Sequence, residues 1–151
     1  MNGEVKFEMQ QSTPPNMPQA LRLACIIDDD TVYIKLVKKL LELKKLCDNI
    51  LVFENGKEAI EYFRKSKVEK VELPELILLD LNMPVMNGWE FLDEFDNIRE
   101  SLEINPSLYV VSSSIDPIDS EKARSKKFVE DYISKPISLK TFEDICGKIA
   151  S

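Results

Sequence analysis

The strongest constraint in this sequence is a repeated alternation between short apolar runs and longer stretches with helical periodicity. From Leu21 onward, five apolar runs are each followed by a segment whose apolar residues recur every three or four positions. A short apolar run predicts a buried strand, and a longer periodic stretch predicts a helix. The alternation therefore predicts an α/β fold, a doubly wound parallel five-stranded sheet with helices on both faces. Two strand orders are common in such sheets, and periodicity does not choose between them.

The expected elements can be placed along the chain. The strands are expected at 23–27, 50–53, 76–79, 108–111 and around 132–133. The first helix has an apolar stripe at helical spacing, formed by Tyr33, Leu36, Val37, Leu40 and Leu41. Asn55 followed by Glu58 resembles a capping box at the start of the second helix. A short polar helix is expected near 118–125.

The chain length and its first segment predict one folded domain. The 151 residues are enough for a single domain with its own core. Residues 1–20 are polar and contain Pro14, Pro15 and Pro18, so we interpret them as a flexible N-terminal tail. Residues 21–151 form the predicted domain.

Charge and composition restrict the partners and the compartment. The net charge of −7 opposes non-specific binding to nucleic acid. No apolar run approaches the roughly 18 residues of a membrane span, and no secretion signal begins the chain, so no membrane partner is expected. Three scattered cysteines without a metal-ligand spacing indicate buried, reduced thiols in a cytoplasmic protein.

Polar residues follow four of the five expected strands. Asp28 and Asp29 follow the first strand, Asp80 the third, Ser112 the fourth and Lys135 the fifth. Ligands of open parallel sheets bind outside the carboxyl ends of the strands. We therefore expect these acids, the hydroxyl and the ammonium group to meet at one edge of the sheet.

This set of side chains favours phosphoryl chemistry with a metal ion. Clustered carboxylates repel one another, and a divalent cation removes that cost. The chain contains no histidine, and oxygen ligands favour Mg²⁺ or Ca²⁺. Mg²⁺ typically uses one or two carboxylates, which leaves an aspartate free to accept a phosphoryl group as an acyl phosphate. Lys135 and Ser112 can stabilise the phosphoryl oxygens.

Four segments resemble the signature segments of response-regulator receiver domains of two-component signalling. They are residues 26–30, 78–88, 111–113 and 132–136, in the family's order, and the resemblance covers about residues 21–150. The pattern Asp-x-x-Met-Pro-x-Met-x-Gly, which begins at Asp80, is the most specific of them. The resemblance implies a flavodoxin-like (βα)5 fold with strand order 2-1-3-4-5.

The resemblance also implies roles for individual residues. Asp80 would be the phosphoacceptor and one of the metal-binding residues. Asp29 would bind Mg²⁺ directly, Asp28 would act largely through water, and the backbone carbonyl of Asn82 would be a further ligand. Lys135 would contact the phosphoryl group.

Two further residues match the family's switch positions. Ser112 takes the place of the switch hydroxyl, where threonine is commoner, and Tyr132 matches the aromatic residue whose rotamer is coupled to it. The resemblance also implies a cis peptide bond between Lys135 and Pro136. Asn82 and Ser114 lie where side chains tune the rate of dephosphorylation.

The implied function is a phosphorylation-controlled binding module. A sensor histidine kinase or a histidine phosphotransfer protein would supply the phosphoryl group, and an unknown downstream protein would recognise the altered surface. About fifteen residues follow Pro136, so we expect no DNA-binding output domain. The chain would catalyse only its own phosphorylation and dephosphorylation. Phosphorylation-dependent homodimerisation stays open.

Three other classes use similar features. A phosphatase or phosphotransferase of the haloacid-dehalogenase kind also has an aspartate nucleophile and Mg²⁺, but that class needs an acid two residues later, where this chain has Asn82. Turnover of a small phosphate ester would favour this enzyme class. A degenerate receiver would lack the acids, hydroxyl or lysine that are present here. A flavodoxin-type cofactor binder would need a phosphate loop after the first strand.

Overall fold

The computed structural model describes residues 20–103 and 105–150 of the chain. Apart from residue 20, the predicted tail lies outside the described residues. The strands are β1 (Leu21–Ile27), β2 (Cys47–Phe53), β3 (Leu76–Leu79), β4 (Ser107–Ser112) and β5 (Val129–Ser134). The helices are α2 (Thr31–Leu43), α3 (Gly56–Lys65), α4 (Gly88–Ile98), the 3₁₀ turn η2 (Arg99–Ser101), α5 (Pro117–Arg124) and α6 (Leu139–Ala150).

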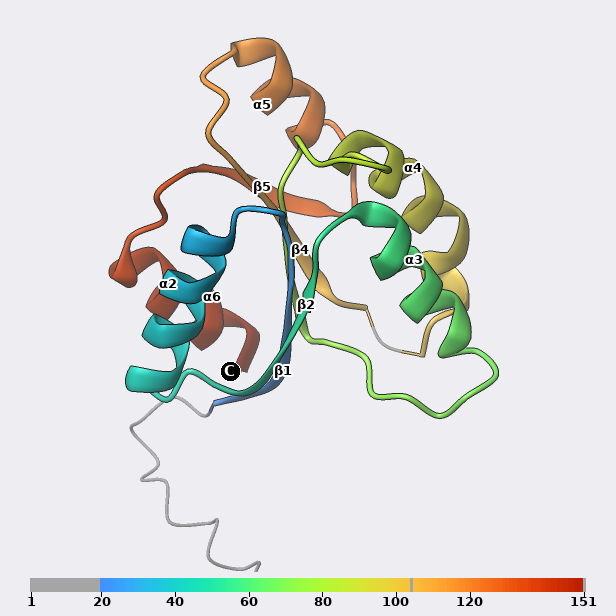
Figure 1. Cartoon of the computed structure of the whole chain (residues 1–151), viewed down its shortest axis with the longest axis horizontal. Helices are drawn as coiled ribbons and strands as arrows, with labels where there is room; N and C mark the ends of the chain where they lie inside the picture. The colour runs from blue at the N-terminus through green and yellow to red at the C-terminus, as the bar shows by residue number, and fades with distance from the viewer. Residues whose placement is uncertain (1–19, 104, 151) are drawn as a thin grey trace, which may run out of the picture.

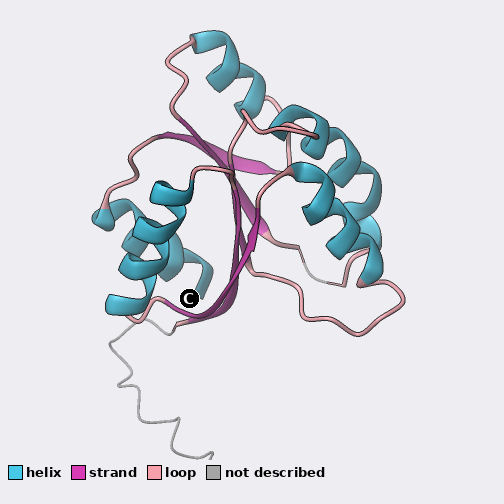
Figure 2. Ribbon diagram, in the orientation of Figure 1, coloured by secondary structure: helices cyan, strands magenta, loops and turns pink. Residues whose placement is uncertain are grey.

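Within the described residues, five parallel strands form one sheet in the order β2-β1-β3-β4-β5, which confirms the order that the family resemblance implied. Helices cover both faces of this sheet (Figure 2). Ile27 is in register with Phe53 on one side and with Leu79 on the other. The carboxyl ends of the three adjacent strands are therefore level, and the loops that follow them share one edge.

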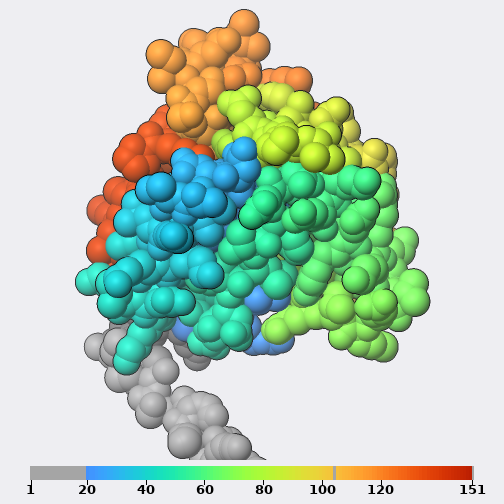
Figure 3. All heavy atoms as spheres, in the orientation of Figure 1, coloured from blue at the N-terminus to red at the C-terminus, as the bar shows by residue number. Residues whose placement is uncertain are grey.

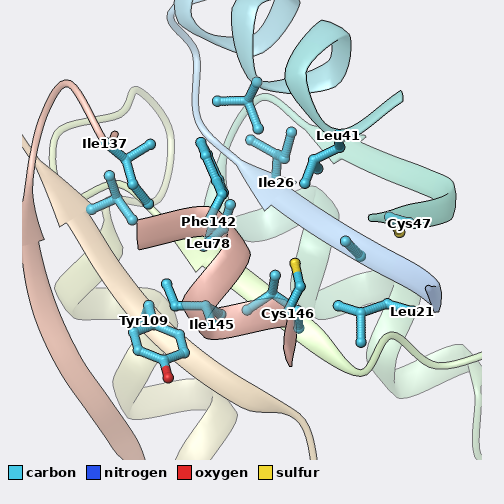
Figure 4. Close-up of a cluster of buried hydrophobic side chains, with 14 of the residues drawn as sticks. Leu21, Ile26, Leu41, Cys47, Leu78, Tyr109, Ile137, Phe142, Ile145 and Cys146 are labelled. Carbon is cyan, nitrogen blue, oxygen red and sulfur yellow. The ribbon is translucent and has the colours of Figure 1, made fainter. Parts of the chain in front are cut away.

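The residues of β1 and β3 alternate between two hydrophobic cores. Helices α2 and α6 lie on one face of the sheet, and α3 and α4 lie on the other (Figure 1). Ile26 and Leu78 belong to the core under α2 and α6, whereas Ile27 and Leu79 belong to the core under α3 and α4. Burial on both sides explains why residues 23–27 of β1 and all four residues of β3 are apolar. Figure 4 shows side chains of α6, among them Phe142, packed over the strands of the first core.

The second core is rich in aromatic rings. Phe63 of α3 and Phe91 of α4 each lie with their ring centroids 5.4 Å from that of Phe95, which is the spacing of favourable aromatic pairs. Helix α5 contributes one buried residue, Ala123, to this core. Its remaining surface is accessible, and Figure 3 shows α5 (orange) standing out at one end of the molecule.

Helices α3 and α4 each begin with an Asn three residues before a Glu, and the two pairs differ in how completely they form a capping box. At α4, Asn87 accepts a hydrogen bond from the N–H of Glu90, whose carboxylate accepts one from the N–H of Asn87, so this helix has the complete capping box. At α3, Asn55 accepts from the N–H of Glu58 at 3.0 Å. The Glu58 carboxylate instead accepts from the N–H of the residue before Asn55, so the predicted capping box is only half formed.

The apolar stripe of α2 and the cysteines complete the core. Tyr33, Val37 and Leu41 are buried, whereas Leu36 is 49% exposed and lies off the buried stripe, contrary to the expectation from spacing. The three cysteines are free and buried, as predicted. Burial raises the pKa of their thiols, to about 12 at Cys146, so these groups stay protonated.

Candidate functional site

The carboxyl edge of the sheet gathers the polar residues that follow the strands. Backbone hydrogen bonds extend the strand ladders to these residues and fix their positions. The N–H of Asp80 donates to the carbonyl of Ile27, and the N–H of Lys135 donates to the carbonyl of Ser112, both at 2.9 Å. The N–H of Asp28 is bonded to the last residue of β2 at the same distance. The rigid sheet therefore holds the backbone of each of these residues directly.

Three carboxylates converge at this edge. Asp28, Asp29 and Asp80 each place a carboxylate oxygen within 4.8 Å of the others. Asp28 and Asp80 are only 1% and 7% exposed, whereas Asp29 is exposed. Asp30 is separate from the cluster, because its side chain caps α2 by accepting from two backbone N–H groups. The structure thus brings together the acids from the ends of β1 and β3.

Lys135 supplies a positive charge to the buried acids. Its Nζ lies 2.8 Å from Oδ2 of Asp28 and 3.8 Å from Oδ1 of Asp80. The second oxygen of Asp28 accepts a hydrogen bond from the N–H of Asp30 at 2.9 Å. The peptide bond between Lys135 and Pro136 is cis, as the family resemblance implied.

The charge of this cluster is incompletely compensated. Burial raises the pKa of Asp80 from its ordinary value of 3.8 to about 6; the neighbouring Asp28 charge adds to this, and Lys135 opposes it. Burial likewise raises the pKa of Asp28, although Lys135 and the N–H of Asp30 favour its charged form. A raised carboxyl pKa means that the folded site destabilises the carboxylate. One ammonium group is therefore insufficient for the two buried acids.

The donor set fits a hard divalent cation. The clustered ligand atoms are all carboxylate oxygens, which are the ligands that Mg²⁺ prefers. A dication would supply the positive charge that the raised pKa of Asp80 shows to be lacking. The exposed carboxylate of Asp29 leaves one side of the cluster open to water and to a substrate.

The loop after β3 folds back over the end of that strand. The N–H of Gly88 donates to the carbonyl of Leu81 at 2.9 Å. A Cβ atom at position 88 would lie 2.3 Å from the carbonyl oxygen of Asp80, so only glycine fits this approach. Asn82 lies in this loop with an exposed side chain, and its carbonyl as a metal ligand stays a prediction.

Ser112 and Tyr132 are both hydrogen-bonded to the same loop residue, Ser114. Ser112 is fully buried, and its Oγ accepts a hydrogen bond from the N–H of Ser114 at 3.1 Å. The hydroxyl of Tyr132 donates to the carbonyl of Ser114 at 2.8 Å. Ser114 itself donates from its Oγ to the carboxylate of Asp119 in α5 at 2.6 Å. The two predicted switch residues are therefore linked through Ser114 to the first turn of α5.

Sequence reasoning missed the contact of Tyr33 with the site. Helical spacing predicts Tyr33 as part of the buried stripe of α2, and it is buried. Its ring also lies beneath the ammonium group of Lys135, with Nζ 4.3 Å from the ring centroid. Spacing along the helix could not show this contact, because the two residues are about a hundred positions apart in the chain.

Comparison with known proteins identifies the class. The response regulator receiver domain model matches residues 24–146, which is most of the chain. The chain therefore belongs to the response regulator receiver domain family of two-component signalling. This match favours a receiver over the phosphatase and cofactor-binding alternatives.

The proteins similar in sequence to this chain include both kinases and regulators. The autoinducer 1 sensor kinase/phosphatase LuxN of Vibrio campbellii is 31% identical over 122 residues, which are 81% of this chain and 13% of that protein. The probable methanogenesis regulatory protein FilR2 of Methanothrix harundinacea is 28% identical over 120 residues, 80% of this chain and 74% of that protein. The chain thus spans only a small part of the sensor kinase.

Solved structures share the fold over nearly the whole described chain. A two-component response regulator from Cytophaga hutchinsonii aligns with a TM-score of 0.78 at 27% identity, covering 87% of this chain and 98% of that one. The phosphorylated cyanobacterial phytochrome response regulator RcpA aligns with a TM-score of 0.69 at 27% identity, covering 86% and 91%. Among the described residues, no helix is both long and apolar enough to cross a bilayer.

Proposed function

We propose that this receiver accepts a phosphoryl group on Asp80 in a reaction that depends on Mg²⁺, and that the change controls a protein-binding surface. The observation that carries the proposal is the cluster of Asp28, Asp29 and Asp80 at one edge of the sheet, two of them buried, with Lys135 beside them. Such a cluster is costly to the fold, and phosphoryl transfer with a bound dication gives it a use.

Each residue of the cluster has a role in the proposal. Asp29, Asp80 and the carbonyl of Asn82 would hold Mg²⁺, with Asp28 acting through water. The bound ion supplies positive charge that offsets the phosphoryl oxygens. Lys135 would bind a phosphoryl oxygen. The pKa of Asp80, raised to about 6, still leaves its carboxyl group mostly ionised at pH 7, as a nucleophile must be.

The phosphoryl donor would be a phosphohistidine of a sensor histidine kinase or of a histidine phosphotransfer protein. A carboxylate oxygen of Asp80 attacks phosphorus in line, the new O–P bond forms, and the P–N bond breaks. The imidazole leaves as a neutral ring after its other nitrogen has taken a proton. Two observations support a receiver that is phosphorylated: the intact acid set and the likeness to RcpA, which is known in a phosphorylated form.

The output would pass through Ser112. Its Oγ accepts one hydrogen bond here, so the hydroxyl proton is available to a phosphoryl oxygen on Asp80. Movement of Ser112 would alter its bond to Ser114, and with it the bond from Tyr132 and the first turn of α5. Tyr132 is buried and bonded to Ser114 in this structure, so the change at Ser112 would reach it through that residue.

The surface of α5, β5 and α6 would then bind a downstream protein, in a cytoplasmic pathway without nucleic-acid or membrane contact by this domain. Homodimerisation is one form such binding can take. We further propose that the chain turns over no external substrate beyond its phosphodonor. Residues 21–151 would be sufficient for all these steps, and residues 1–20 would be dispensable for phosphorylation.

Labelling with acetyl phosphate tests the proposal. The protein is incubated with acetyl phosphate and Mg²⁺, and its intact mass is measured. We expect one added phosphoryl group on the native chain, none after Asp80→Asn, and none when a chelator removes Mg²⁺. Glu103→Gln, an exposed acid remote from the site, is the matched control and should label normally. Equal labelling of Asp80→Asn, or no labelling of the native chain, would contradict the proposal.

A further inference from the structure

We propose that Tyr33 is a positioning residue for Lys135, and that its ring face holds the ammonium group beside Asp28 and Asp80. This inference rests on the proposed function, because it concerns the lysine that would bind the phosphoryl group. The observation that carries it is geometric. Nζ of Lys135 lies 4.3 Å from the centroid of the Tyr33 ring while it is 2.8 Å from Oδ2 of Asp28.

The surroundings of Lys135 explain why a ring face is suitable there. The ammonium group is a mobile point charge on a flexible four-carbon stem, so its position depends on the groups around it. Two carboxylates attract it, at 2.8 and 3.8 Å, and its side chain is only 13% exposed. The negative face of an aromatic ring attracts a cation without forming a directed hydrogen bond. The ring of Tyr33 therefore retains the ammonium without fixing it on one partner.

This property matters for the phosphoryl step. In the structure the ammonium is bonded to Asp28 and lies 3.8 Å from Oδ1 of Asp80. To contact a phosphoryl oxygen on Asp80 it must loosen its contact with Asp28 and shift toward Asp80. A ring face lets the cation slide across it at little cost, whereas a third carboxylate would hold the cation back.

The hydroxyl of Tyr33 supports the assignment to the ring. Tyr33 is 7% exposed, and its hydroxyl has no hydrogen-bond partner among the described residues. A buried hydroxyl without a partner gives nothing to the core, which a phenylalanine would fill as well. Burial and the nearby acids raise the pKa of the phenol, so the ring stays neutral. The ring is therefore the part of Tyr33 in contact with Lys135.

Two substitutions separate the ring from its hydroxyl. Tyr33→Phe keeps the ring face and removes the unpartnered hydroxyl, whereas Tyr33→Leu keeps an apolar side chain and removes the ring. With saturating Mg²⁺ and acetyl phosphate, we expect Tyr33→Leu to label about three- to tenfold more slowly than the native chain, as the loss of one cation–π contact implies. Tyr33→Phe should label within about twofold of the native rate on the same grounds.

A spectroscopic measurement tests the contact without phosphorylation. The ring current of Tyr33 should shift the proton resonances of the methylene group next to Nζ of Lys135, which Lys135→Arg identifies by their loss. We expect this shift in the native chain and in Tyr33→Phe, and we expect it to disappear in Tyr33→Leu. If Tyr33→Leu does not fold, Tyr33→Met supplies the same comparison with a more adaptable side chain.

The outcomes distinguish the two proposals. If the native chain fails to label, the proposed function fails, while the resonance shift still tests the ring contact. If the native chain labels, and Tyr33→Leu labels equally fast, the inference about Tyr33 is overturned. Equal slowing of Tyr33→Phe and Tyr33→Leu overturns it too, since the effect would then belong to the hydroxyl.

Discussion

The two edges of the sheet both carry acids, but they hold them differently. At the amino edge, a hollow of about 690 Å³ is lined by Glu75, Glu103 and Glu130 together with Arg22. These acids are exposed or half-buried, and Arg22 donates its backbone N–H to Glu75. At the carboxyl edge, Asp28 and Asp80 are almost fully buried.

This difference indicates that buried carboxylates identify the functional site better than the volume of a surface hollow does. Exposed acids are stabilised by water, and an exposed ion pair adds little to stability. Buried acids must be compensated by the fold or by a ligand, so their presence calls for a function.

The largest expected effect is on the pH dependence of stability. The pKa of Asp80 is raised from 3.8 to about 6 in the folded protein, so the folded state binds its proton more tightly than the unfolded state does. Stability is therefore lost as pH rises from about 4 to about 6. Asp80→Asn removes this loss and should stabilise the metal-free protein at pH 7 by up to about 3 kcal/mol. Urea denaturation of the native chain and of Asp80→Asn at pH 4 and pH 7 measures the free energies of unfolding that test this.

The amino edge supplies the control for this experiment. Glu103→Gln should leave the free energy of unfolding at pH 7 within about 0.5 kcal/mol of the native value, as for most surface substitutions. If Asp80→Asn were no more stable than Glu103→Gln at pH 7, the carboxyl edge would hold no uncompensated charge.

Two glycines give the next largest contrast. A Cβ atom at Gly88 would lie 2.3 Å from the carbonyl oxygen of Asp80, whereas one at Gly147 in α6 would have no neighbour within 4 Å. Gly88→Ala should therefore destabilise the protein by about 1–3 kcal/mol. Gly147→Ala should stabilise it by about 0.5–1 kcal/mol, because alanine favours a helix. Thermal unfolding of both variants measures the contrast, and effects of equal sign would refute the close approach at Gly88.

Mg²⁺ binding should distinguish the acids of the two edges. Asp29→Ala should weaken binding about tenfold or more, because it removes a carboxylate from the cluster. Glu103→Ala at the amino edge should leave the affinity unchanged. Isothermal titration of each variant measures the dissociation constant. Unchanged affinity in Asp29→Ala would remove this residue from the metal site.

The smallest expected effect concerns backbone strain near the two edges. Val85, after β3, and Lys45, before β2, have positive φ values of 67° and 53°. A β-branched side chain is strained there, so Val85→Gly should stabilise the protein by about 1 kcal/mol after the entropy cost of glycine. Lys45→Gly should have a smaller effect, since lysine is not β-branched. Chemical denaturation measures the free energy of unfolding of both variants, and a larger increase for Lys45→Gly would show that Val85 is not the more strained residue.

Much of the site could be predicted because it lies at strand ends. The apolar runs predict where β1, β3, β4 and β5 end. The polar residues at those ends were therefore predicted to lie together: Asp28, Asp80, Ser112 and Lys135. The parallel class followed from the alternation, whereas the strand order needed the family resemblance. Strand pairing depends on contacts between distant segments, which periodicity does not record.

Other features depended on side-chain geometry and were missed or misplaced. Leu36 fits the helical spacing of α2 yet is exposed, because the buried stripe is rotated toward Ile34, which is buried, and away from Leu36. The capping box is complete at Asn87 rather than Asn55, since the carboxylate of Glu58 turns to another N–H. The contact of Tyr33 with Lys135 depends on two rotamers that no local pattern specifies.

Identifying which carboxyl group becomes phosphorylated decides whether Asp80 is the phosphoacceptor. Borohydride reduces an acyl phosphate to an alcohol, so phosphorylated aspartate becomes homoserine, which peptide sequencing by mass spectrometry locates. After treatment with acetyl phosphate and Mg²⁺, we expect homoserine at position 80, and none when a chelator is present. Homoserine at position 28 or 29 instead, or at no position in the chain, would contradict this expectation.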